Sequence, residues 1–236
     1  AGLRAREYGA PMDVLWLRIP RKDSDKQNIF GIIDGEHMMV LLDRDDYWQA
    51  AYLVPKGGDA KLRAQPIDVL RVSIAQLAPF LADRVASITS WNEVKTLEVQ
   101  VDRLERWHKP GLLLIGDAAH AMSPVGGVGI NLAIQDAVAA ANALAKPLRE
   151  GGVIQESLLA QIQRRREWPV RVVQKIQIVM QKRIISRALE QSGKPPNVPA
   201  LLRWLLGFRA VRHIPARLFG YGIRQEHVHT DSSPVC

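Results

Sequence analysis

The sequence predicts a mixed α/β fold, in which an antiparallel sheet is followed by packed helices. Three observations support this class. Short runs rich in Val, Ile, Leu, Trp and Tyr fill residues 12–54, and apolar residues recur at three- and four-residue spacing from Pro66. A glycine-bounded apolar run then precedes a second helical pattern within residues 112–148. Short β-branched and aromatic runs are typical of strands, and a period near 3.6 residues is typical of helices.

The first strands are expected at residues 12–19, 28–33, 37–42 and 47–54, because clusters of Pro, Gly and Asp separate these runs. The dipeptide Asp34-Gly35 lies between the second and third runs. It readily supplies the positive φ angles of a tight hairpin, so these two strands are expected to be antiparallel neighbours. A meandering antiparallel sheet is the simplest arrangement.

A helix with one buried stripe is expected from Pro66 to Val85, with a kink or a restart at Pro79. Residues 91–101 alternate again and predict a further strand. The continuous apolar run at 112–115 predicts a strand that is buried on both faces of a layered core.

Two longer helical patterns follow. Residues 130–148 are rich in alanine and predict a tightly packed helix, whereas residues 155–191 predict a long helix that is interrupted at Pro169. A short helix is expected at 199–206, and the polar tail from Gln225 is expected to be mobile.

The composition excludes several classes of protein. The 236 residues are 47% hydrophobic and 24% charged, and no stretch of 18 consecutive apolar residues exists, so no membrane span is predicted. The lone cysteine, Cys236, excludes an intrachain disulfide framework and a cysteine zinc site, and it suits the cytoplasm. No metal site is expected, since His227 and His229 lack a third ligand at a convincing spacing.

The net charge of +8 would suit a polyanionic partner if it were spread evenly. The run Arg164-Arg165-Arg166 is the strongest argument for such a partner. No aromatic residues are interleaved with the arginines and no nucleic-acid motif accompanies them, so solvated arginines on a surface helix are the better interpretation, and no nucleic acid is expected as a partner.

The most informative stretch runs from Leu112 to Asp136. An acidic side chain, Asp117, follows the apolar run, and a glycine-rich loop at residues 126–129 then opens a helix. Ligands of α/β sheets bind at this edge, and the first N–H groups of a helix favour negative charge. The pattern therefore predicts a ligand site, with a capped turn that has no ligand as the alternative. His120 is expected to be a packed, hydrogen-bonded residue, outside any catalytic set.

The same stretch resembles, nearly position for position, the Gly-Asp motif of the para-hydroxybenzoate hydroxylase family of FAD-dependent monooxygenases. The matching residues are Gly116-Asp117-Ala118-Ala119-His120, Pro124, Gly126, Gly129, Asn131 and Asp136. The resemblance implies that Asp117, with Gly116, binds the ribityl chain of FAD. It also implies that the amides of Ile130 and Asn131 face the flavin pyrimidine edge, and that the loop from Pro124 to Gly127 lines the space where flavin and substrate meet.

The resemblance implies an activity as well. NADPH or NADH would reduce FAD, O2 would add at flavin C4a, and the hydroperoxide would hydroxylate an aromatic or similar small hydrophobic substrate. Because the cofactor carries this chemistry, no catalytic side chain is assigned. The alternatives are another oxidoreductase of the same superfamily, such as a prenyl reductase, and a non-catalytic fragment that does not hold FAD.

Further resemblance to the family's substrate-domain sheet and carboxyl-terminal region divides the chain into four segments. They are a remnant of the FAD-binding domain at 1–10, the substrate-domain sheet and helix at 11–91, the FAD-binding segment with the Gly-Asp motif at 92–154, and a helical region at 155–236. The family's Gly-x-Gly-x-x-Gly turn has no counterpart in this sequence. We therefore expect that an amino-terminal dinucleotide-binding unit is missing, and that this chain alone does not hold FAD tightly.

Strand aromatics supply a candidate substrate pocket. Trp48, Tyr52 and Trp16 would form flat apolar walls, and Pro124 and Val125 would complete the pocket, although core packing is the more common role of such rings. The identity of the substrate, the choice between NADH and NADPH, and a homodimeric state are left open by the sequence.

Overall fold

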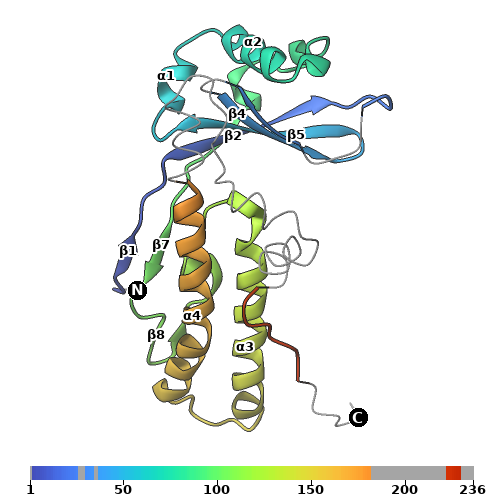
Figure 1. The fold of residues 1–236 in the computed structure, drawn as a ribbon. Coiled ribbons are helices and arrows are strands. Elements are labelled where there is room, and N and C mark those ends of the chain that lie inside the picture. Colours follow the sequence, from blue (N-terminus) through green and yellow to red (C-terminus); the bar gives the residue numbers. More distant parts are fainter. Residues whose placement is uncertain (1, 26–29, 35–36, 182–221, 230–236) are drawn as a thin grey trace, which may run out of the picture. The chain divides into compact units, whose positions relative to one another are not determined.

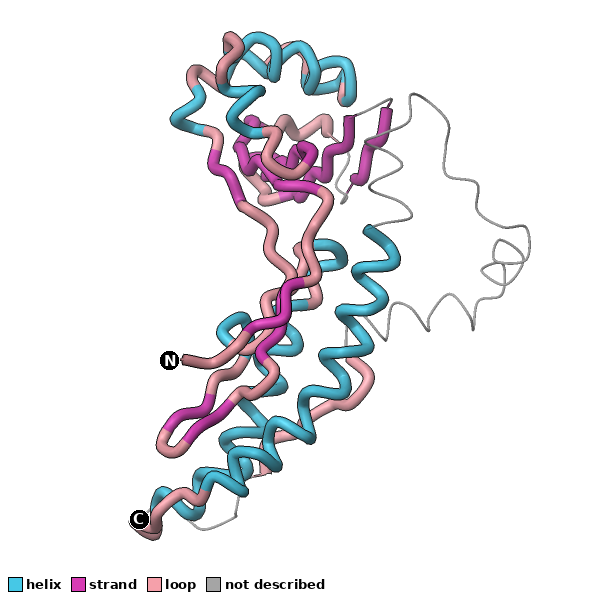
Figure 2. The backbone as a smooth tube through the Cα atoms, turned by 90° about the vertical axis from the view of Figure 1, so that its left-hand side faces the viewer, coloured by secondary structure: helices cyan, strands magenta, loops and turns pink. Residues whose placement is uncertain are grey.

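The computed structural model describes residues 2–25, 30–34, 37–181 and 222–229 (Figures 1 and 2). The chain divides into two units. Unit 1 lies within Ala1–Gly9, Gln100–Ile178 and Val198–Cys236, and unit 2 lies within Ala10–Val99 and Val179–Asn197. Both units contain strands and helices, which confirms the mixed α/β class.

Unit 2 is built on a five-stranded antiparallel sheet with the strand order β3-β4-β5-β2-β6. Its strands are β2 (Met12–Pro20), β3 (Phe30–Asp34), β4 (His37–Asp43), β5 (Tyr47–Pro55) and β6 (Lys95–Leu97). The four strands expected in the first 55 residues all form, and β3 and β4 are antiparallel neighbours as predicted.

The expected meander is wrong in one respect. β2 pairs with β5 rather than with β3, in a continuous register from Met12↔Pro55 to Pro20↔Tyr47. These two strands are nine residues long and largely buried, so their pairing at the centre of the sheet removes the most apolar surface from water.

Helices cover one face of this sheet. Leu15, Leu17 and Ile19 alternate along β2 and pack with Leu70 and Ile74 of α2 (Ile67–Leu77). The helix begins after Pro66 and ends before Pro79, where the chain restarts as the short helix η1 (Pro79–Leu81), as the sequence predicts. The remaining short elements of this layer are α1 (Asp59–Arg63), η2 (Val85–Ser87) and η3 (Trp91–Glu93).

The strand predicted over residues 91–101 is wrong over most of its length. Only the three residues of β6 are extended as a strand; Leu97 is 40% exposed, whereas Val99 and Val101 are each 2% exposed. Leu97, Val99 and Val101 therefore do not lie on one face of a single strand, because the chain passes from unit 2 to unit 1 after Val99.

Unit 1 contains two long helices, α3 (Gly129–Arg149) and α4 (Glu156–Met180), which lie side by side (Figures 1 and 2). Two small antiparallel pairs accompany them. These are β1 (Ala5–Glu7) with β7 (Asp102–Leu104), and β8 (His108–Lys109) with β9 (Leu112–Leu113). Two short helices, η4 (Gly116–Ala118) and η5 (Val125–Gly127), connect β9 to α3.

The prediction of a doubly buried strand at 112–115 is wrong within the described residues. β9 is two residues long, pairs only with β8, and is half-buried. Leu113 of β9 and the following Leu114 are partly buried and pack against the cluster that contains Trp107 and Val170.

The two predicted long helices form, with corrections to their details. α3 buries Leu132 and Ala139, but Ile130, Ile134 and Leu148 are 68%, 56% and 59% exposed, so the helix is not tightly packed on that side. α4 continues through Pro169 without the predicted interruption. Residues 182–191 and the expected helix at 199–206 lie outside the described residues.

Residues 225–229, which belong to the tail expected to be mobile, make defined polar contacts with α3. Residues 222–229 run beside α3 (Figure 1), and the Asn142 side chain binds this segment at both the His227 carbonyl oxygen (2.8 Å) and the His229 amide (3.0 Å). Hydrogen bonds hold this segment in place although it contains few apolar residues.

By length and composition, the segment Val125–Arg149 would suffice to cross a membrane, although no span was predicted; it is the one such helix in the described part of the chain. Its buried Asp136 forms an ion pair with Arg166 of α4, at 2.9 Å between Oδ1 and Nε. A charged pair of this kind is typical of helices that pack against each other inside a protein.

Candidate functional site

The Gly-Asp turn lies against α3. Gly116 is buried with φ +56°, and a Cβ at this position would lie 3.0 Å from the Cβ of Ala133, which is closer than side chains normally pack. Glycine is therefore required here both for its left-handed backbone and for the close approach of turn and helix. The next residue, Asp117, is exposed.

The glycine loop leads directly into α3. Gly126 and Gly127 have φ angles of +80° and +62°, and both are exposed. The residue at the N-cap of α3, Val128, forms no side-chain hydrogen bond to the helix, and Ile130 in the first turn is exposed. The first N–H groups of a long helix, together with its dipole, attract negative charge.

A cluster of buried side chains packs against the Gly-Asp turn. Asp136 of α3 accepts a hydrogen bond from the Gly116 amide (3.1 Å), and its Oδ2 lies 2.6 Å from the Nε2 of His120. His120 is fully buried, and its ring lies 5.0 Å from the ring of Trp107. The expectation that His120 is a packed, hydrogen-bonded residue is confirmed.

Two glutamines of α4 hold the loop between the turn and α3. The Nε2 of Gln177 donates to the carbonyl oxygens of Ser123 (2.9 Å) and Val125 (2.8 Å). The Nε2 of Gln174 donates to the carbonyl oxygen of Ala121 at 3.1 Å. No sequence pattern predicted the role of these residues, because a glutamine within a polar helix is usually solvent-exposed.

The predicted cofactor-binding residues are thus brought together at one edge of unit 1. They are Gly116, Asp117, Pro124, Gly126, Gly127, Gly129, Ile130 and Asn131. An exposed carboxylate can accept hydrogen bonds from hydroxyl groups, and helix N-terminal amides can face carbonyl oxygens or developing negative charge. This donor set fits the ribityl chain and the pyrimidine edge of FAD, but it offers nothing comparable for the pyrophosphate.

Two of the three aromatic residues predicted for a substrate pocket lie in the protein core instead, and the third, Trp16 of β2, is half-buried. Trp48 and Tyr52 are 0% and 3% exposed in the core of unit 2, on the side covered by α2. The indole of Trp48 donates to Asp25 (2.8 Å), and the Tyr52 hydroxyl lies 2.8 Å from the Oγ of Ser73. Burial raises the pKa of Tyr52. For these rings the structure favours the core role, the other alternative that the sequence allowed.

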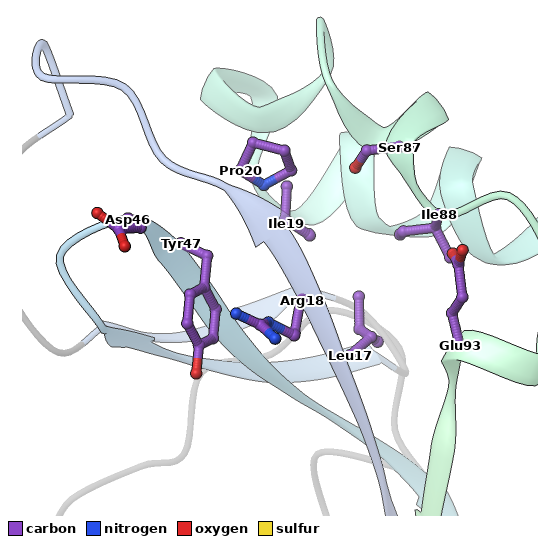
Figure 3. Close-up of a pocket in the computed structure, with 9 residues that line it drawn as sticks. All are labelled: Leu17, Arg18, Ile19, Pro20, Asp46, Tyr47, Ser87, Ile88 and Glu93. Atoms are coloured by element: carbon purple, nitrogen blue, oxygen red, sulfur yellow. The ribbon is translucent and has the colours of Figure 1, made fainter.

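Unit 2 contains a cavity of about 540 Å³ that the sequence did not single out. Figure 3 shows its walls at the end of β2 and at η2, with the Arg18 guanidinium 3.8 Å from the centre of the Tyr47 ring. The lining residues are Leu17, Arg18, Ile19, Pro20, Asp46, Tyr47, Ser87, Ile88 and Glu93. Pro124 and Val125, the other predicted pocket residues, are half-buried in the loop of unit 1.

Comparison with known proteins adds independent support for a flavin site. The family model described as "FAD binding domain" matches residues 3–175. The 6-methylpretetramide 4-monooxygenase of Streptomyces rimosus is 30% identical over 220 residues, which are 93% of this chain and 51% of the relative. A kynurenine 3-monooxygenase of Stenotrophomonas maltophilia is 41% identical over 128 residues, which are 54% of this chain and 26% of the relative.

Solved structures show the same fold. PqsL, a probable FAD-dependent monooxygenase from Pseudomonas aeruginosa, superposes with a TM-score of 0.61 at 22% identity, covering 80% of this chain and 51% of that chain. The chain spans about half the length of the Streptomyces rimosus relative. The family model matches most of this chain, and the matched residues include the Gly-Asp turn, the glycine loop and α3. The chain therefore belongs to the family of FAD binding domains.

Proposed function

We propose that this protein is an FAD-dependent, NAD(P)H-consuming monooxygenase that acts on an aromatic or similar small hydrophobic substrate. One observation carries the proposal: the close packing of Gly116 on Ala133 holds the turn with the exposed Asp117 carboxylate against the beginning of α3, which the glycine loop enters. The family match and the monooxygenase names of the relatives support it.

The turn and the beginning of α3 each have a proposed role. The Asp117 carboxylate accepts hydrogen bonds from the ribityl hydroxyls, and the amides of Ile130 and Asn131 face the pyrimidine edge. Bound FAD would supply the electron transfer and oxygen activation. The protein contributes fixed dipoles: the N-terminus of α3 stabilises negative charge at the flavin edge without reorganisation.

The other requirements of the reaction are also part of the proposal. Either NADPH or NADH is the reductant, and the cytoplasm is the compartment. The Gly-x-Gly-x-x-Gly turn has no counterpart in this sequence, so no residue of this chain is assigned to the pyrophosphate of FAD.

The test uses the purified protein with excess FAD, NADH or NADPH, and a panel of phenols and aromatic acids under ¹⁸O₂. The proposal predicts that a substrate stimulates NAD(P)H oxidation and that its product gains one labelled oxygen atom. Asp117→Ala is expected to weaken FAD binding, whereas Glu150→Gln, which changes an exposed acid at the far end of α3, serves as the matched control.

Two results would overturn the proposal. Substrate-dependent turnover without incorporation of label would instead indicate another oxidoreductase of the same superfamily. Absence of flavin binding at every concentration tested would indicate a non-catalytic protein.

A further inference from the structure

The arginine run of α4 contains one residue that is unlike its neighbours. Arg164 and Arg165 are exposed, as expected for a solvated basic helix, but the Arg166 side chain is fully buried. A buried guanidinium is costly unless charged and polar partners surround it. The interpretation of this run as solvated arginines is therefore wrong for Arg166.

The Arg166 guanidinium joins three parts of unit 1. Its Nε donates to Asp136 Oδ1 of α3 at 2.9 Å, and its Nη1 donates to the Arg224 carbonyl oxygen at 3.1 Å. The same Nη1 lies 3.5 Å from Glu226 Oε1. Arg224 and Glu226 belong to residues 222–229, which we call the strap.

Residues other than Arg166 also hold the strap. Exposed Arg165 donates to both carboxylate oxygens of Glu226, at 2.7 and 2.8 Å, and Asn142 binds its far end. The Glu226 side chain is only 2% exposed. Burial alone would raise the pKa of Glu226, but the hydrogen bond from Arg165 and the nearby arginine charges outweigh burial and keep this pKa below its usual value.

On the opposite side of Arg166, Asp136 reaches the Gly-Asp turn. Its Oδ2 accepts the Gly116 amide and contacts His120, while its Oδ1 is bound by Arg166. The Oδ1 atom of this fully buried carboxylate is therefore bound by Arg166, while Oδ2 is bound by the turn. Removing or shifting Arg166 leaves a buried charge that must find new partners, and the Gly116 amide is attached to it.

We propose, building on the proposed function, that Arg166 is a positioning residue for FAD. By binding Asp136 on one side and Glu226 on the other, it makes the geometry of the Gly116–Asp117 turn dependent on the docking of the strap. The docking of the strap thereby adjusts the affinity for FAD through Arg166.

The experiment compares four variants of the purified protein with the wild type. Glu226→Gln weakens the strap side of Arg166, and Arg166→Lys keeps the charge but loses the planar fork. Glu226→Asp is the conservative rescue, and Arg164→Lys is the matched control at an exposed position of the same helix. The first readout, without FAD, is hydrogen exchange of the backbone at residues 116–120. The second is FAD affinity, measured by titration of flavin fluorescence.

We expect Glu226→Gln and Arg166→Lys to speed exchange at residues 116–120 and to weaken FAD binding, each by about tenfold. Glu226→Asp should recover part of both effects, and Arg164→Lys should match the wild type. If Arg166→Lys does not fold, Glu226→Gln at the edge of the cluster tests the same coupling.

Unchanged exchange at residues 116–120 in Glu226→Gln would overturn the proposal. Faster exchange with wild-type FAD affinity would overturn it too, because the cluster would then be purely structural. A wild type that binds no FAD counts against the proposed function, and the exchange data alone then decide whether the strap and the turn are coupled.

Discussion

Replacing Gly116 with alanine is the sharpest perturbation of the Gly-Asp turn. The backbone there has φ +56°, and the new Cβ would lie 3.0 Å from the Cβ of Ala133. Ala133→Gly removes the atom that the new methyl group meets. Combining the two substitutions therefore separates the backbone strain at Gly116 from the steric clash with α3.

The magnitudes follow from these two contributions. A left-handed conformation costs a non-glycine residue about 1–2 kcal/mol. Overpacking against the helix adds about 1–3 kcal/mol, so Gly116→Ala should lower the free energy of unfolding by about 2–5 kcal/mol. Ala133→Gly alone should cost about 1 kcal/mol, as expected for glycine inside a helix. The double variant should be less destabilised than the sum of the two, by about the overpacking term.

Urea unfolding of the four proteins, followed by circular dichroism, measures these differences. Hydrogen exchange at residues 107–120 shows whether the loss lies in unit 1. Strict additivity of the two substitutions would refute the proposed close approach of turn and helix. A Gly116→Ala variant as stable as the wild type would refute the left-handed backbone as well.

Three other expectations concern the rest of the molecule. Trp48→Ala should destabilise unit 2 by about 3–5 kcal/mol in urea unfolding, because the indole is fully buried, and a neutral result would contradict its core location. Burial opposes ionisation of Asp13, but hydrogen bonds from Lys56 and two amides lower its pKa overall. Unit 2 should therefore lose stability as the pH falls through this lowered pKa; Asp13→Asn should reduce that dependence, and an unchanged pH profile would argue against the pairing. Gln177→Leu should speed hydrogen exchange at residues 123–125, and unaltered exchange would show that its two hydrogen bonds do not hold the loop.

Local patterns in the sequence were sufficient for most elements but not for their pairing. The runs within residues 12–54 predict their strands because alternation is a property of neighbouring residues. The position of β2 beside β5 depends on a pairing between distant residues that no local pattern specifies. The prediction for the apolar run at 112–115 was wrong for a similar reason. A run of apolar residues does not specify whether one or both faces of a strand are covered by other elements.

The candidate site shows the same division. Gly116, Gly126 and Gly127 could be predicted because a positive φ angle favours glycine whatever the surroundings, and all three adopt it. Arg166 could not be predicted, since its neighbours in the run are exposed and its partner Asp136 lies 30 residues away. Burial of one arginine among three is decided by tertiary packing alone.

The central claim is that the turn at Gly116–Asp117 and the start of α3 hold FAD. Titration of the isotope-labelled protein with FAD, followed by NMR of its backbone amides, tests this residue by residue and also works for weak binding. The account predicts that the largest shifts occur at residues 116–118 and 126–131. Saturable binding that leaves these amides unshifted, with changes concentrated elsewhere, would contradict it.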